Sequence, residues 1–177
     1  MNLRPPLNED DISQQLNAFL QAKAKSNNLL FGFSSRKGVN FLIWVQPFVI
    51  TANPIFVIEA KRLRLAQRDY VQGRTGGIEL FKREQEGFSF DLKHCAMMVY
   101  VQQQTFSYWF EQINNWIAQL IADNEKYNDI VWEEADKLVE LSSATKYVSN
   151  FVSKHSRKTL PRLTIRHFWL DMRGDKF

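Results

Sequence analysis

The segment Phe56-Val57-Ile58-Glu59-Ala60-Lys61 predicts a β-strand buried on both faces. Glu59 and Lys61 lie two positions apart, so their side chains point to the same face of the strand. A carboxylate and an ammonium at the end of a buried strand are costly unless something engages them. One arrangement that meets this cost is a divalent cation held by Glu59, with Lys61 beside a phosphate. The other is an ion pair between the two side chains.

Regular secondary structure is expected on both sides of this strand. Helices are expected where apolar residues recur at helical spacing, over residues 8–25, 78–85 and 106–123. Strands are expected at the shorter apolar or alternating runs, over residues 29–34, 39–45, 55–60, 95–101, 138–141, 146–152 and 163–170. Central strands covered by helices indicate an α/β protein with a mixed β-sheet. No repeat or long linker interrupts the pattern, which predicts a single domain over residues 1–177.

The composition favours a folded intracellular protein. The 177 residues are 45% hydrophobic and 14% aromatic, with a net charge of +4. Cys95 is the single cysteine, so an intramolecular disulfide and a cysteine-based zinc site are both excluded. No run approaches the roughly 20 apolar residues that cross a bilayer, and the N-terminal residues lack the apolar core of a secretory signal. We therefore expect a soluble, cytoplasmic protein without membrane contact.

An ordered set of segments surrounds the Glu59/Lys61 strand. The set comprises Gly73-Arg74-Thr75-Gly76-Gly77-Ile78-Glu79-Leu80-Phe81-Lys82, Met98-Val99-Tyr100-Val101-Gln102, Asn114-Asn115-Trp116-Ile117, Ser153-Lys154-His155-Ser156-Arg157 and Leu163-Thr164-Ile165-Arg166-His167-Phe168-Trp169-Leu170-Asp171. With the preceding helix and strands, this order resembles a bacterial branch of the PD-(D/E)XK, restriction-endonuclease-like superfamily. The resemblance covers roughly residues 8–171.

The resemblance implies metal-dependent cleavage of DNA phosphodiester bonds, in host defence or DNA processing. Glu59 and Lys61 match the catalytic E-x-K motif, and Glu59 would hold Mg²⁺ or Mn²⁺. The first acidic residue of the motif is missing, because Asn40 stands at the best-matching position of the preceding strand. An amide oxygen can bind a hard cation but contributes less than a carboxylate. Glu9, in the first helix, is the best candidate for the missing acid; its alternative role is to stabilise the helix N-terminus.

Basic side chains cluster after the Glu59/Lys61 strand. The predicted contacts to the DNA backbone are Arg62, Arg64, Arg68, Arg74, Lys82 and Arg83. A solvated basic loop is the alternative interpretation of the same residues. His167 alternates with apolar strand positions, which favours a packed, hydrogen-bonded histidine. Cys95 is expected to be a small buried side chain.

Two further functions remain open from the sequence. The missing strand acid is also compatible with a catalytically degenerate nuclease-fold protein that binds nucleic acid or a partner protein without cleaving. The third alternative is a dimerising scaffold or regulatory subunit with no nucleic-acid contact.

Overall fold

The computed structural model describes residues 9–27, 31–36, 39–45, 54–65, 68–73, 77–84, 91–123, 130–141 and 145–173. The elements in chain order are α1 (Glu9–Ser26), β1 (Phe31–Arg36), β2 (Val39–Val45), β3 (Phe56–Leu63), η1 (Arg68–Tyr70), α2 (Ile78–Arg83), β4 (His94–Val101), α3 (Phe106–Ala122), η3 (Glu134–Asp136), β5 (Val139–Glu140), β6 (Val148–His155) and β7 (Leu163–Asp171). This order confirms the α/β class predicted from the sequence.

The strands in the described part of the chain form one mixed sheet, in the order β1-β2-β3-β4-β7-β6-β5. β1, β2 and β3 are an antiparallel meander, and β4 and β7 run parallel to β3. At the far edge of the sheet, β6 runs antiparallel to β7, and β5 runs antiparallel to β6. The parallel β3–β4 pair needs a crossover connection, which contains η1 and α2. β3 is therefore the strand at which the antiparallel part of the sheet meets the parallel part.

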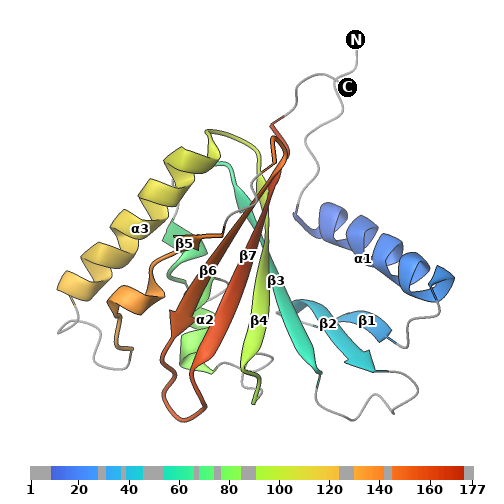
Figure 1. The fold of residues 1–177 in the computed structure, drawn as a ribbon, viewed down its shortest axis with the longest axis horizontal. Helices are drawn as coiled ribbons and strands as arrows, with labels where there is room; N and C mark the ends of the chain where they lie inside the picture. Colours follow the sequence, from blue (N-terminus) through green and yellow to red (C-terminus); the bar gives the residue numbers. More distant parts are fainter. Residues whose placement is uncertain are drawn as a thin grey trace.

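Helices cover both faces of this sheet, and Figure 1 shows α1 and α3 on opposite sides of it. On the α1 face, Ile12 packs with Phe41, Ile58 and Tyr100 in a small cluster. On the other face, a larger core joins α2 and α3 to the inward side chains of the central strands. The strands β3 and β4 contribute alternate residues to the two clusters, as the pleat of a doubly covered sheet requires.

α3 forms where the sequence predicts it. Thr105 caps the helix by accepting a hydrogen bond from the backbone N of Tyr108 at 3.1 Å. Its predicted apolar stripe is buried in the larger core, at Trp109, Ile113, Trp116, Ile117 and Leu120. Cys95 is buried, as predicted.

The predicted bounds were wrong at several element ends. β3 continues to Leu63, because Lys61 and Arg62 remain paired with β4. β6 runs to His155, although the sequence suggested an end at residue 152. Its inward side chains include Ser149, Ser153 and His155, so the apolar alternation expected of a half-buried strand is missing there. None of the helices in the described residues has the length and apolar character that a membrane crossing requires.

Candidate functional site

Glu59 and Lys61 form a buried ion pair on β3. The Nζ of Lys61 lies 2.9 Å from Oε1 of Glu59, and their side chains are 11% and 3% exposed, respectively. Their neighbours Val57 and Leu63 belong to the larger core, whereas Ile58 belongs to the cluster beneath α1. By strand alternation, both charged side chains therefore face the side of the sheet that α2 and α3 cover. The opposite charges reduce the cost of removing each group from water.

The structure places Asn40 beside Glu59 in the sheet. In the antiparallel β2–β3 pair, Phe41 is opposite Ile58 and Leu42 is opposite Val57. Extending this register by one residue brings the backbone of Asn40 opposite that of Glu59. The strand that carries Asn40 is thus the direct neighbour of the strand that carries Glu59.

Glu9 begins α1, which lies on the other side of the sheet. The buried Ile12 packs there against Phe41 and Ile58, and the Ser13 hydroxyl lies 3.4 Å from the Tyr100 hydroxyl. The face beneath α1 is opposite to the one that Glu59 occupies. The helix that bears Glu9 is thus separated from the Glu59 side chain by the sheet.

The predicted basic surface is only partly present. Arg64 and Arg68 are exposed, and Arg62 is half-buried on the strand face opposite to Glu59. Arg83 forms an ion pair with Glu79, its Nε lying 2.5 Å from Oε1. Arg74 lies outside the described residues.

Lys82 does not belong to that surface, so the prediction that it contacts DNA was wrong. Its side chain is 1% exposed, and its Nζ donates hydrogen bonds of 2.7 and 2.9 Å to the two carboxylate oxygens of Asp136. The same ammonium lies 4.9 Å from the ring centroid of Trp132, a cation–π contact. A phosphate outside the protein cannot reach an ammonium enclosed in this way. The sequence did not reveal this because the partner Asp136 is 54 residues away.

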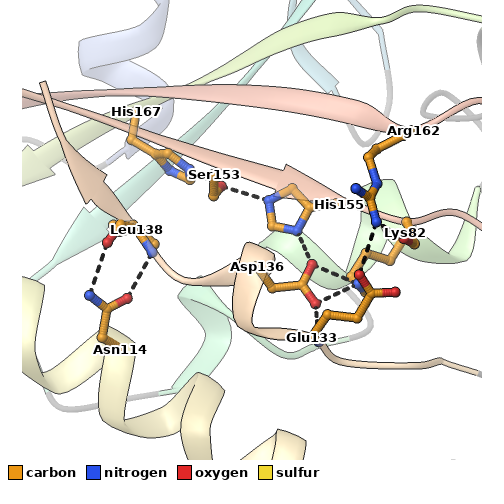
Figure 2. A network of polar contacts seen from close by, with 10 residues as sticks. Lys82, Asn114, Glu133, Asp136, Leu138, Ser153, His155, Arg162 and His167 are labelled. Atoms are coloured by element: carbon orange, nitrogen blue, oxygen red, sulfur yellow. Dashed lines mark hydrogen bonds and ion pairs between the residues drawn. The ribbon is translucent and has the colours of Figure 1, made fainter.

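A second polar assembly fills the interior between β6, β7 and the crossover segments, and Figure 2 shows much of it. We call it the polar chain, and it consists of the side chains of Trp169, Tyr70, His167, Ser153, His155 and Asp136. Every member is at most 2% exposed. Burial of this many polar groups is tolerated because each is hydrogen-bonded to the next.

The links of the polar chain are short and continuous. Nε1 of Trp169 lies 3.2 Å from the Tyr70 hydroxyl, which lies 2.6 Å from Nδ1 of His167. The Ser153 hydroxyl bridges the two histidines, 2.7 Å from Nε2 of His167 and 2.6 Å from Nε2 of His155. Nδ1 of His155 then lies 2.5 Å from Oδ1 of Asp136. The packed histidine predicted at position 167 is confirmed, whereas its partners were missed.

The environment sets the charge of these groups at neutral pH. Burial lowers the pKa of His155, against the opposing hydrogen bond and charge of Asp136. Burial also lowers the pKa of His167 well below its usual value, and neighbouring His155 lowers it further. Burial alone would raise the pKa of Asp136, but the hydrogen bonds and charges of His155 and Lys82 outweigh it and lower this pKa. Burial raises the pKa of the Tyr70 hydroxyl. The histidines and the tyrosine are therefore neutral, and Asp136 is ionised.

The segment that supplies Asp136 is held on two sides. The backbone N of Glu133 donates to Oδ2 of Asp136 at 2.6 Å, and Arg162 donates to the Glu133 carboxylate at 3.1 Å. On α3, the Asn114 amide exchanges two hydrogen bonds with the backbone of Leu138, at 2.8 and 3.1 Å (Figure 2). These contacts fix η3 against the end of the polar chain.

The polar chain and the Glu59/Lys61 pair share one face of the sheet. Glu59 is in register with Met97 on β4, and Met97 is in register with His167 on β7. Two strand spacings, roughly 10 Å, therefore separate the backbones of Glu59 and His167. In the described residues, no three His, Cys, Asp or Glu side chains gather in a way that could hold a metal ion. A cavity of about 400 Å³ lies elsewhere, lined by residues of α3 and the β5–β6 hairpin that include Phe110, Glu111, Glu140 and Phe151.

Comparison of the chain with protein-family models, with curated proteins and with solved structures finds no match.

Proposed function

We propose that the chain is a restriction-endonuclease-like domain that acts on phosphodiester bonds of DNA through Glu59 and Lys61. The observation that supports this most is the 2.9 Å pair of carboxylate and ammonium on β3, at the junction of the antiparallel and parallel parts of the sheet. The order of one helix, three antiparallel strands, a crossover and a parallel strand agrees with the core that the resemblance implies.

The chemistry assigned to the pair follows from its charges. The Lys61 ammonium would stabilise the negative charge that develops on a phosphate under attack. Glu59 offers one carboxylate, and the register of β2 and β3 brings the backbone of Asn40 opposite that of Glu59. Mg²⁺ is commonly bound by one or two carboxylates together with substrate phosphates and waters. These residues thus fit a cation shared with the DNA better than one bound by the protein alone. When bound, such a cation supplies charge neutralisation and an acidified water.

Cleavage of plasmid and linear DNA in Mg²⁺ or Mn²⁺ tests the proposal. Activity should be lost in Glu59→Gln and in Lys61→Met. Glu134→Gln and Lys137→Met are the matched controls, because Glu134 and Lys137 form an exposed pair of the same chemistry at 2.7 Å. Absence of cleavage in the parent protein, or equal cleavage in all four variants, would remove the enzymatic proposal.

A second candidate is a nuclease-fold protein that binds DNA without cleaving it. It is favoured by the engagement of the Glu59 carboxylate by Lys61 and by the amide at position 40. It predicts salt-dependent DNA binding that is unchanged by Mg²⁺ and weakened by Arg64→Gln. Binding of this kind without cleavage would select it over the first candidate. Absence of binding at low salt would exclude both.

A further inference from the structure

The hydrogen bonds of the polar chain have one permitted direction when both histidines are neutral. The ionised Asp136 only accepts, so Nδ1 of His155 carries the hydrogen of that 2.5 Å contact. Nε2 of neutral His155 then accepts, and Ser153 must donate to it. The Ser153 oxygen is left to accept from Nε2 of His167. Nδ1 of His167 accordingly accepts from the Tyr70 hydroxyl.

The opposite end of the polar chain gives the same direction independently. The indole Nε1 of Trp169 is only a donor, so the Tyr70 oxygen accepts from it at 3.2 Å. The hydroxyl hydrogen of Tyr70 is then available for Nδ1 of His167. The two ends agree, and every ring nitrogen along the path has a matched partner. His155 is thus the Nδ1–H tautomer, and His167 is the Nε2–H tautomer.

We propose that the polar chain is a two-state proton switch, in which protonation of His155 reverses every hydrogen bond between His155 and Tyr70. An imidazolium at His155 donates from both nitrogens, so Ser153 accepts from it and turns its hydrogen toward His167. His167 stays neutral but becomes the Nδ1–H tautomer, which donates to the Tyr70 oxygen. The second state holds one proton more than the first, and that proton comes from water.

The reversal changes the position of the Tyr70 hydrogen. In the second state the Tyr70 oxygen accepts from both Trp169 and His167, so its own hydrogen must turn away from β7. Tyr70 is the last residue of η1, which follows β3 in the chain. A charge gained near η3 is thereby converted into a changed contact between η1 and β7. The polar chain is thus a packed assembly with two discrete arrangements of its hydrogen bonds, as a switch requires.

The groups that surround His155 determine when it gains the proton. Asp136 and Glu133, on the η3 side, favour the charged ring, whereas Lys82 from α2 disfavours it. Arg162 lies next to Glu133, with its Nη2 3.1 Å from the Glu133 carboxylate. His167, the other histidine of the polar chain, is neutral and adds no charge near His155. Burial of the ring disfavours its charged form most and lowers the pKa of His155, so the reversal belongs to the acidic side of neutrality, below the usual pKa of histidine.

Nitrogen NMR of histidine-labelled protein tests the proposal directly, because the chain has three histidines and the third, His94, is exposed. At pH 8 the ring ¹⁵N shifts and ring couplings should report Nδ1–H for His155 and Nε2–H for His167. Acidification should charge His155 and, in the same step, convert His167 to the neutral Nδ1–H tautomer. His94→Gln assigns the reference signal and should leave both events unchanged.

Ser153→Ala is the decisive variant, since it removes the bridge between the rings. In that protein, His155 should titrate without changing the tautomer of His167. Tyr70→Phe, which removes the other partner of His167, is the second test: His167 should remain Nε2–H at pH 8, because the Ser153 oxygen still accepts from that nitrogen. Any other tautomer pattern in the parent at pH 8 would overturn the proposal. So would titration or unfolding on acidification without the tautomer change, or an unaltered coupling in Ser153→Ala.

Discussion

Replacing Lys82 with methionine should remove a large share of the stability of this domain. The substitution keeps most of the apolar stem but deletes the ammonium that donates hydrogen bonds of 2.7 and 2.9 Å to Asp136. Both side chains are at most 1% exposed, so water cannot take the place of the lost partner. The Asp136 carboxylate would keep its hydrogen bonds to His155 and to the backbone of Glu133. It would lose the neighbouring ammonium that balances its negative charge.

The size of the effect follows from this geometry. A hydrogen bond to a charged group contributes about 1.5–3 kcal/mol, and two are lost. Removing one partner of a buried ion pair typically costs about 3–5 kcal/mol. We therefore expect Lys82→Met to lower the free energy of unfolding by about 3–5 kcal/mol, against a usual total of about 5–15 kcal/mol for a domain.

Urea unfolding followed by tryptophan fluorescence measures this loss. Lys137→Met is the matched control, because Lys137 lies 2.7 Å from Glu134 in an ion pair whose side chains are 31% and 75% exposed. Such surface pairs contribute about 0–1 kcal/mol. A double-mutant cycle of Lys82→Met with Asp136→Asn should show strong coupling. A cost for Lys82→Met no greater than that of Lys137→Met would show that the buried pair contributes no more to stability than a surface pair.

Three further predictions concern pH, backbone geometry and the candidate site. Because the pKa of both buried histidines is lowered in the fold, the unfolded chain binds more protons below about pH 6.5. The free energy of unfolding from urea curves should therefore fall as the pH is lowered, by up to about 2.7 kcal/mol per pH unit for two protons, and a value that does not change with pH would contradict this. Gly77→Ala should cost at least roughly 1–3 kcal/mol in thermal unfolding, since φ is +102° and a Cβ would lie 2.5 Å from the carbonyl oxygens of residues 69 and 70; unchanged stability would contradict this. Glu59→Gln should destabilise the protein by about 1–3 kcal/mol because it leaves the Lys61 ammonium without its counter-charge, and a neutral result in urea would mean that the pair is not buried in solution.

Much of the fold could be predicted because its indications are local. The stripe of α3 and the apolar run before Glu59 are patterns of adjacent residues, and helix and strand periodicity reports them directly. The facing of Glu59 and Lys61 to one side also follows from the two-residue repeat of a strand. β6 was harder, because serine and histidine occupy inward positions where apolar side chains are expected.

Local patterns in the sequence were sufficient for the α/β class, the course of most helices and strands, and the placing of Glu59 and Lys61 on one face of β3. The burial of Lys82 against Asp136, the separation of α1 from Glu59 by the sheet and the bridge of Ser153 between two histidines emerge only in the folded chain. The difference lies in distance along the chain. Tyr70 and His167 are 97 residues apart, and they meet because parallel β4 and β7 and the crossover through η1 bring them to one face. Periodicity has a range of a few residues, whereas contacts of this kind depend on the register of the whole sheet.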